Sequence, residues 1–489
     1  MHLAAVLLSD TIEGLSMQAE IAVKRNATLL EFRLDALKNI SYTDLADLFS
    51  RIQVPKIVTY RSTWNNGRST LPRSDREELL LSLSEMDIDY IDFEYPHDMA
   101  LVPKIPDNVR IVLSFFDFEG LAKIYFETIE SIIQSFPKLI IKIGATPVNI
   151  SDLKVLWRWA HILQKNNIDH IVLGLGQIGQ ITRIKGYDLG NVWVYGQIDE
   201  KIGEPFSPGM LRLSVIERSL DPETIIVGQI GTKHFRYYSR GIRFLYKLMG
   251  KKAIVLNVPL EYEAEMVGLL NWIKDGLFDY LIVEDIWSDI LVNYLDREDM
   301  SITETSRCNL IKVVNKELVG YNTEYYVIQS LVEDYIRETL SPFVYVEGVN
   351  SIGKAAIGYF LSIDSEVVIR NRTSSKTENL MRRYPKLINN KKSLIQNYDI
   401  LVNCIPFGLP GLPKMTPVPL SILNNLRLVI DSVIAPDDLP LSMEQENYNF
   451  EYVDGKEVFI DKLLEIIKIV NGQTPPKASL NVSILFRDL

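Results

Sequence analysis

The chain has 489 residues, of which 47% are hydrophobic and 24% charged, and its formal net charge is -11. A chain of this length predicts about three domains, each with a sizeable core. The acidic balance argues against partners such as nucleic acid or an anionic membrane, so small-molecule ligands are expected. Two cysteines are too few for a disulfide framework or a cysteine-rich metal site, and they predict a reducing, cytoplasmic location.

Short apolar runs alternate with amphipathic segments through the first 218 residues. The runs predict eight strands, at residues 3–8, 28–34, 56–61, 90–95, 109–116, 139–145, 170–176 and 192–198. Segments between them, such as 119–135 and 149–165, have apolar residues at helical spacing. Eight strand–helix units over about 215 residues predict a (β/α)8 TIM barrel, whose chemistry lies at the carboxyl ends of its strands.

Lys142 lies in the middle of an apolar predicted strand, Leu139-Ile-Ile-Lys-Ile-Gly-Ala145. Burial favours the neutral amine of a lysine, which makes Lys142 a candidate Schiff-base nucleophile. The alternative is an edge-strand lysine whose ammonium reaches water.

Charged residues lie at the predicted carboxyl ends of several strands. They are Glu31 and Arg33 on one face of the second strand, Arg61 at the end of the third, Glu94 near the end of the fourth, and Arg183 in a glycine-bearing loop after the seventh. Together with Lys142 they predict a cationic pocket that binds a carboxylate around an amine nucleophile. Alternatively, Glu31 and Arg33 form a buried ion pair and the other arginines are solvated.

Several motifs in this half resemble the type I 3-dehydroquinate dehydratases, over roughly residues 1–215. They are Glu31-Phe-Arg33-Leu-Asp35, Thr59-Tyr-Arg61, Ser114-Phe-Phe116-Asp117-Phe118, Ile141-Lys142-Ile-Gly144 and Thr182-Arg183. The resemblance implies that Lys142 forms an imine with the ketone of 3-dehydroquinate, after which water is eliminated to give 3-dehydroshikimate. It also implies that Arg61 and Arg183 hold the substrate's carboxylate and hydroxyls, with Glu31 and Arg33 beside them.

Three positions depart from that family. Its catalytic histidine, its glutamate after the strand-three arginine and its late substrate-binding glutamine correspond to Phe116, Asn65 and Met210. A phenyl ring cannot carry a proton, and loss of a positioned acid–base group lowers a rate by about 10²–10⁴-fold. His97, in the loop after the fourth predicted strand, is a candidate substitute for the histidine.

The barrel pattern stops at the polar connection 218–224, and two further α/β domains are expected. Residues 225–340 contain short strands at 225–228, 252–256 and 280–283, which predict a small lobe. Residues 341–489 open with a buried strand at 343–348, a turn over 348–354, a helix over 355–361 and a strand at 366–370. This pattern is typical of the first βαβ unit of a Rossmann dinucleotide-binding fold, in which amides at the helix start face a pyrophosphate.

The expected cofactor is NADP. The turn Gly348-Val-Asn350-Ser351-Ile-Gly353 keeps only the first and last of the usual glycines. The next strand ends in Asn371-Arg372-Thr373, where an NAD enzyme would have an acidic residue for the ribose hydroxyls. An arginine there can pair with the 2′-phosphate of NADP, unless Arg372 is simply a solvated surface residue.

The second half resembles the shikimate dehydrogenases over roughly residues 225–489. The motifs are Gly320-Tyr-Asn322-Thr323-Glu324, Asn371-Arg372-Thr373 and Asp399-Ile-Leu-Val-Asn403, followed by a helix near 456–470 that is expected to return to the first lobe. The resemblance implies that Glu324 replaces the family's catalytic aspartate, and that Ser239, Asn309 and Asn322 bind substrate. The family's catalytic lysine corresponds to Ser288, one of its paired serines to Tyr237, and its late glutamine falls near Lys462.

The order of the two halves implies a bifunctional enzyme of the shikimate pathway, because the product of the first resembled enzyme is the substrate of the second. Such an enzyme would dehydrate 3-dehydroquinate and then reduce 3-dehydroshikimate with NADPH. Three alternatives stay open: a non-catalytic metabolite-binding or regulatory homologue, a chain in which only the dehydratase half is active, and an aldolase-type Schiff-base barrel. The changes at Ser288 and Glu324 predict weak or absent reduction by the second half.

Overall fold

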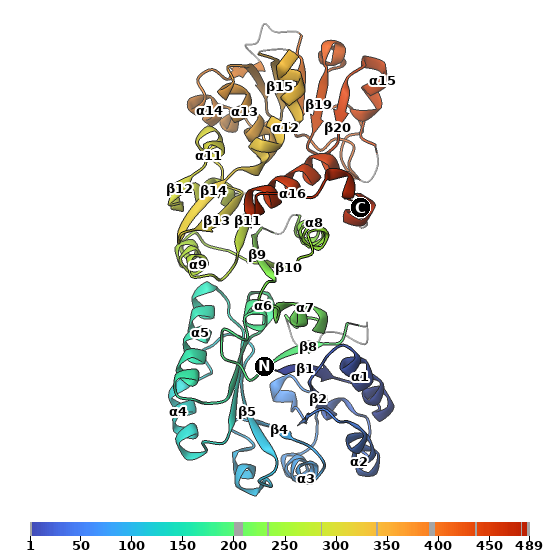
Figure 1. Ribbon diagram of the computed structural model, residues 1–489, viewed down its shortest axis with the longest axis vertical. Helices are drawn as coiled ribbons and strands as arrows, with labels where there is room; N and C mark the ends of the chain where they lie inside the picture. The colour runs from blue at the N-terminus through green and yellow to red at the C-terminus, as the bar shows by residue number, and fades with distance from the viewer. Residues whose placement is uncertain are drawn as a thin grey trace. The chain divides into compact units, whose positions relative to one another are not determined.

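The computed structural model describes residues 2–199, 209–231, 234–284, 286–338, 341–390, 397–435, 438–480 and 482–486. The chain divides into two compact units, Met1–Thr224 with Val258–Leu269, and Ile225–Asn257 with Leu270–Leu489. The first unit contains one eight-stranded sheet and the second contains two six-stranded sheets (Figure 1). In the part of the chain described here, no helix is both long enough and apolar enough to cross a bilayer.

The first unit is a nearly closed parallel barrel with strand order β7-β6-β5-β4-β3-β2-β1-β8, as the alternating pattern predicted. Its strands are β1 His2–Leu7, β2 Leu29–Arg33, β3 Lys56–Thr59, β4 Tyr90–Glu94, β5 Arg110–Asp117, β6 Ile140–Ala145, β7 His170–Gly174 and β8 Trp193–Gln197. The predicted strand ends lie within two residues of these bounds. Its helices are α1 Ile12–Lys24, α2 Tyr42–Arg51, α3 Arg73–Ser84, α4 Phe126–Ser135, α5 Ile150–Lys165, α6 Gly176–Ile184 and α7 Leu213–Ser219.

The helix predicted over 119–135 is wrong in its first part, since α4 begins only at Phe126. The Asp117 carboxylate accepts the backbone N–H groups of Glu119, Gly120 and Lys123 at 2.9–3.1 Å. These hydrogen bonds give the chain an alternative to helix directly after β5.

Arg183 lies on helix α6 and not in a loop as predicted. A Cβ on Gly179 would lie 2.3 Å from the carbonyl carbon of Gly174, so the absence of side chains lets the helix pack directly against β7. The Thr182 hydroxyl accepts the Gly174 N–H at 2.8 Å and donates to the Gly179 carbonyl at 2.7 Å. These contacts anchor the turn of helix that carries Arg183.

The first sheet of the second unit has the order β10-β9-β11-β13-β14-β12. Its strands are β9 Ile225–Ile230, β10 Ala253–Asn257, β11 Tyr280–Val283, β12 Arg297–Glu298, β13 Leu310–Val314 and β14 Glu317–Tyr321. Helices α8 Phe235–Leu248, α10 Trp287–Ile290 and α11 Met300–Thr305 belong to the same unit, whereas the boundary between the units falls within α9 Ala264–Lys274. The prediction missed the antiparallel hairpin β13–β14. Its turn residues Asn315 and Lys316 both have positive φ, a conformation that the sequence signals less clearly than an Asn-Gly pair would.

The second sheet is entirely parallel, with order β17-β16-β15-β18-β19-β20, which is the strand order of the dinucleotide-binding folds. Its strands are β15 Phe343–Glu347, β16 Glu366–Arg370, β17 Ile388–Asn389, β18 Ile400–Asn403, β19 Leu428–Asp431 and β20 Glu451–Val453. The helices of this part are α12 Thr323–Glu338, α13 Ser351–Ser362, α14 Ser374–Arg383, α15 Gln445–Tyr448, α16 Gly455–Asn471 and α17 Val482–Leu485. Ligands bind such sheets where the strand order reverses, here between β15 and β18.

Helix α13 begins at Ser351, four residues before the predicted start at 355, because Asn350 caps it. The Asn350 side chain accepts the Gly353 N–H at 2.9 Å. Gly348 has φ +84°, and a Cβ on Gly353 would lie 3.0 Å from the Gly348 carbonyl oxygen. The two glycines that the sequence keeps are therefore those that this tight turn requires.

The final helix, α16, returns to the first lobe as predicted. Its side chains Phe459, Leu463 and Ile467 are buried in one cluster with Tyr238 and Ile242 of α8. Figure 1 shows α16 in red beside α12 and α8. The helix also contacts α12 and strand β19 of the second sheet, so it connects the two lobes of the second unit.

Candidate active sites

Lys142 is buried in the barrel among carboxylates. Its Nζ lies 2.9 Å from Asp92 Oδ2 and 3.6 Å from Glu31 Oε1, and 4.5 Å from the centre of the Tyr195 ring. Strand β6 pairs on both sides, with β5 and β7. The alternative of a solvated lysine on an edge strand is therefore wrong.

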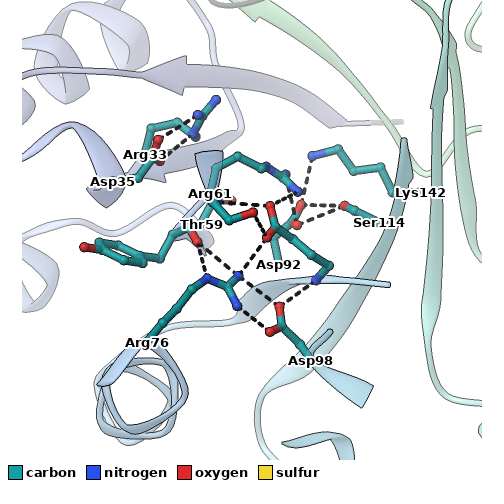
Figure 2. A network of polar contacts seen from close by, with 12 residues as sticks. Arg33, Asp35, Thr59, Arg61, Arg76, Asp92, Asp98, Ser114 and Lys142 are labelled. Atoms are coloured by element: carbon teal, nitrogen blue, oxygen red, sulfur yellow. Dashed lines mark hydrogen bonds and ion pairs between the residues drawn. The ribbon is translucent and has the colours of Figure 1, made fainter. Parts of the chain in front are cut away.

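Asp92 is the central residue of this site, and the sequence analysis missed it (Figure 2). Its carboxylate binds Lys142, accepts the Ser114 hydroxyl at 2.9 Å and pairs with Arg61 at 3.0 Å. Burial opposes ionisation of Asp92, but the charges of Arg61 and Lys142 outweigh it and hold the pKa of the carboxyl below its usual value. The sequence did contain a signal for Asp92, because Asp92 and Glu94 are two residues apart and therefore lie on the same face of the predicted strand.

Two arginines of the predicted cationic pocket, Arg33 and Arg61, are paired with acids, so their charges are partly neutralised. Arg61 lies 3.3 Å from Glu94, which also pairs with Arg76 at 3.1 Å. Arg76 is fully buried, forms a second ion pair with Asp98, and was not predicted. The barrel rim is thus a balanced network that positions Arg61 (Figure 2).

Glu31 and Arg33 do not form the ion pair considered from the sequence. Arg33 forms a bidentate ion pair with Asp35, with N···O distances of 2.8 and 2.9 Å. Glu31 instead accepts the Thr59 hydroxyl at 2.7 Å and faces Lys142. Glu31 is therefore the second carboxylate of the Lys142 site.

Arg183 is buried, and burial, which outweighs the attraction of Tyr195, lowers the pKa of its guanidinium to about 10. A guanidinium that has lost hydration gains most from an anionic ligand. The binding of a carboxylate by Arg183 stays a prediction.

The departures from the dehydratase motifs make one side of the site aromatic. The Phe116 ring stacks on Phe118 with centroids 5.4 Å apart, and the Arg61 guanidinium carbon lies 4.6 Å from the Phe116 centroid. Met210 packs against the barrel core and Asn65 lies in a short 3₁₀ turn. The His97 ring packs on Trp64, with centroids 4.7 Å apart, and its role as a substitute for the histidine stays a prediction.

A cavity of about 890 Å³ lies between the two sheets of the second unit. It is lined by residues from both lobes, including His234, Glu284, Ser288, Arg307, Asn309, Glu324, Asn350, Ser351, Lys354, Lys376 and Lys462. Its volume is in the range of small-molecule sites.

Glu324 and Lys462 form a buried ion pair in this cavity, with Oε1 and Nζ 2.7 Å apart. Burial opposes ionisation of Glu324, but Lys462 and Arg307 outweigh it and hold the pKa of the carboxyl below its usual value. Burial likewise opposes the charge of Lys462, while Glu324 and neighbouring groups raise the pKa of its ammonium above the usual value. Both groups are therefore ionised at neutral pH.

A second pair, His234 and Glu284, lines the same cavity and was also missed. The His234 Nδ1 lies 3.1 Å from Glu284 Oε1, and the Gln229 amide donates to Glu284 Oε2 at 3.1 Å. Burial opposes ionisation of Glu284, and the hydrogen bond with His234 together with the charge of Lys462 outweighs it, so the pKa of this carboxyl is lowered.

The residues predicted to bind substrate in this half differ in where they lie relative to the cavity. Asn309 lines the cavity, and Asn322 supports it from behind, accepting the Asn309 amide at 3.4 Å. Asn322 is completely buried, so it positions Asn309 instead of lining the cavity. Among the described residues that line the cavity Ser239 is absent; it lies on α8.

The turn before α13 fits a dinucleotide. Asn350 and Ser351 line the cavity with Lys354, so the amino end of α13 and an ammonium face it. Gly348 and Gly353 shape the turn.

Arg372 and Thr373 are exposed after β16, where the Asn371 amide donates to the Thr373 carbonyl at 3.0 Å. Lys376 of α14, not predicted, is a further cation of the cavity wall.

Comparisons with known proteins confirm both resemblances that the motifs predicted. Residues 3–225 match the family model of the type I 3-dehydroquinases. The chain is 24% identical to the chloroplastic bifunctional 3-dehydroquinate dehydratase/shikimate dehydrogenase of Arabidopsis thaliana, over 97% of this chain and 83% of that protein. It is 31% identical to the shikimate dehydrogenase (NADP(+)) of Archaeoglobus fulgidus over 34% of this chain and 65% of that protein. It is 29% identical to the 3-dehydroquinate dehydratase of Methanococcus maripaludis, over 38% of this chain and 86% of that protein.

Glu347, directly before the dinucleotide turn, gives a prediction for pH dependence. Burial raises the pKa of its carboxyl to about 7, against 4.5 as the usual value, although Arg370 lies 3.6 Å away. Between about pH 4.5 and about pH 7, the folded protein keeps a proton on Glu347 that the unfolded chain releases. The free energy of unfolding therefore decreases as the pH rises through this interval. In Glu347→Gln that decrease is absent. We expect the melting temperature of the variant, relative to the parent, to be higher at about pH 8 than at about pH 5.

The matched control for this measurement is Glu366→Gln, an exposed glutamate on the neighbouring strand β16. Its melting temperature relative to the parent should not depend on pH over the same interval. If Glu347→Gln and the control show the same dependence, the raised pKa of Glu347 is wrong.

Proposed function

We propose that the chain is a bifunctional enzyme that dehydrates 3-dehydroquinate in the barrel and reduces the product, 3-dehydroshikimate, to shikimate with NADPH in the second unit. The single observation that carries the proposal is the buried Lys142 beside Asp92, at 2.9 Å, within a rim that keeps Arg61 and Arg183. Support for the second activity comes from the ionised pair in the cavity and the dinucleotide turn. The two free cysteines, Cys308 and Cys404, fit the proposed cytoplasmic location.

In the barrel, Lys142 must lose a proton before it can attack a ketone. Asp92 Oδ2, 2.9 Å from Nζ, is the nearest acceptor for that proton. The imine acidifies the adjacent C–H bond, so the next step needs a base close to the nitrogen. Glu31 is the second carboxylate within 4 Å of Nζ, at 3.6 Å. Since Phe116 cannot move protons, we assign both proton transfers to these carboxylates.

In the second unit, bound NADPH would supply the hydride. Asn350, Ser351 and the amino end of α13 would hold its pyrophosphate, and Arg372 its 2′-phosphate. Asn309 would orient the substrate in the cavity.

A second candidate function, a non-catalytic metabolite-binding protein, is favoured by one observation. The Phe116 ring contacts Arg61 at the position where the dehydratases have a histidine.

Trapping of the imine tests the barrel. We expect borohydride reduction in the presence of 3-dehydroquinate to add the ligand's mass to the peptide that contains Lys142, even if turnover is slow. Lys142→Ala should remove the label. Lys56→Ala, which changes a buried lysine at the start of β3, should keep it. An unlabelled parent protein, or a label that survives in Lys142→Ala, would contradict the proposal.

Phe116→His should raise the rate of dehydration at least tenfold, because it restores a proton carrier at the position where the resembled dehydratases have a histidine. Acid–base groups contribute about 10²–10⁴-fold. Formation of 3-dehydroshikimate, followed by its enone absorbance, measures the rate. Phe118→His is the matched control, since Phe118 stacks on Phe116, whereas the Arg61 guanidinium lies over the Phe116 ring. No gain in Phe116→His, or an equal gain in both variants, would contradict the prediction that a proton carrier at position 116 raises the rate.

Arg372 should make the second unit prefer NADPH over NADH. A charge-assisted hydrogen bond contributes about 1.5–3 kcal/mol, so Arg372→Ala should weaken NADPH binding by roughly tenfold or more and leave NADH binding unchanged. Fluorescence titration of both cofactors measures this. Arg382→Ala, an exposed arginine on α14, is the control. Equal affinity of the parent for the two cofactors would remove Arg372 from the cofactor site.

A further inference from the structure

Lys462 is a buried lysine at the cavity that none of the assigned roles uses. It projects from α16, its Nζ lies 2.7 Å from Glu324 Oε1, and it lies 5.5 Å from the centre of the Tyr238 ring. Lys462 and Glu324 both line the cavity together with Asn350 and Ser351 of the dinucleotide turn. Its ammonium therefore lies in the space where substrate and cofactor would meet.

We propose that Lys462 is the proton donor of the ketone reduction, a role that rests on the proposed function of the second unit. As hydride from NADPH forms the new C–H bond, the carbonyl π electrons move to oxygen and leave an alkoxide. The Lys462 ammonium stabilises that negative charge and transfers one proton to it, which gives the alcohol and NADP⁺. The neutral amine then regains a proton from solvent, so charge and protons balance over the cycle.

The neighbouring cations of the cavity are less suited to this step. Arg307 lies 2.6 Å from Asp289, and a guanidinium does not release its proton in proteins. Lys354 is held by the same carboxylate at 2.9 Å. Ser288, which corresponds to the dehydrogenases' lysine, carries no charge, and its hydroxyl donates to the Val283 carbonyl at 3.2 Å. His234, paired with Glu284, and Lys376 of α14 are the remaining rivals.

The packing of α16 fixes the position of Lys462. The adjacent residue Leu463 is completely buried, and a Cβ on Gly241 of α8 would lie 2.3 Å from Leu463 Cδ1. The helix and α8 are therefore in direct contact next to the lysine. Glu324, at the start of α12, fixes the ammonium from the other side. A donor held by both packing and an ion pair meets the requirement that a catalytic group be pre-organised.

The test is steady-state oxidation of NADPH by the full chain with 3-dehydroshikimate. We expect Lys462→Gln to lower kcat by about 10²–10⁴-fold, the contribution of a positioned acid. Fluorescence titration should show unchanged NADPH affinity, which reports that the cavity is intact. Lys468→Gln, which removes an exposed lysine from the same helix, should keep the parent kcat.

Lys462→Arg separates proton donation from charge alone. It keeps the positive charge beside Glu324 but does not release a proton, so we expect a KM close to that of the parent and a kcat at least tenfold lower. Full activity of Lys462→Arg would overturn the donor role. So would a Lys462→Gln variant that keeps more than about a third of the parent kcat, or a loss confined to His234→Gln. A parent that binds NADPH without oxidising it would instead overturn the proposed reduction, and the inference with it.

Discussion

Each candidate site contains a lysine ammonium that is buried against a carboxylate, and the rest of each site is arranged around this pair. Removing an ammonium from water costs several kcal/mol unless a carboxylate and further hydrogen bonds replace the lost hydration. In the barrel, Lys142 of β6 meets Asp92 of β4, and Ser114 of the intervening strand β5 binds the same carboxylate. In the second unit, Lys462 of α16 meets Glu324 of α12. One pair depends on strand register, and the other on the return of the last helix.

The two pairs suit different chemistry because their surroundings differ. Asp92 is shared with Arg61, while Glu31 lies on the other side of Lys142, so the amine has two carboxylates that can accept protons from it. That arrangement places two acceptors within reach of Nζ for the proton that Lys142 releases when it attacks a ketone. Lys462 has Glu324 at 2.7 Å, and the further carboxylate Glu284 also raises the pKa of its ammonium. That arrangement keeps the ammonium charged until an alkoxide forms beside it.

Sequence reasoning succeeded where local pattern decides the structure and failed where tertiary contacts do. The strands were predictable because apolar runs of this kind fold into a parallel barrel, and Lys142 stood out as one charge in such a run. Arg76 and Asp98 could not be assigned to the site, because charged residues in a helix and a loop give no sign of burial. Lys462 lies among Glu457, Asp461, Glu465 and Lys468, so its helix has the charge pattern of a solvated surface. Only the tertiary fold brings the face of the helix that carries Lys462 next to Glu324.

The positions at which the chain departs from the two resembled families also follow the rule that a buried charge needs a partner of opposite charge. In the barrel, the positions of a histidine and a glutamate are both uncharged, as Phe116 and Asn65, and the Phe116 ring covers the guanidinium of Arg61. In the second unit, a lysine is absent at Ser288 while a lysine stands at 462, near the position of a glutamine. Without Lys462, Glu324 would lose the ammonium that lies 2.7 Å from its Oε1, so the lysine at 462 and the glutamate at 324 depend on each other. A missing catalytic residue therefore does not by itself indicate a lost activity, because the charge that a buried partner requires can come from another element of the fold.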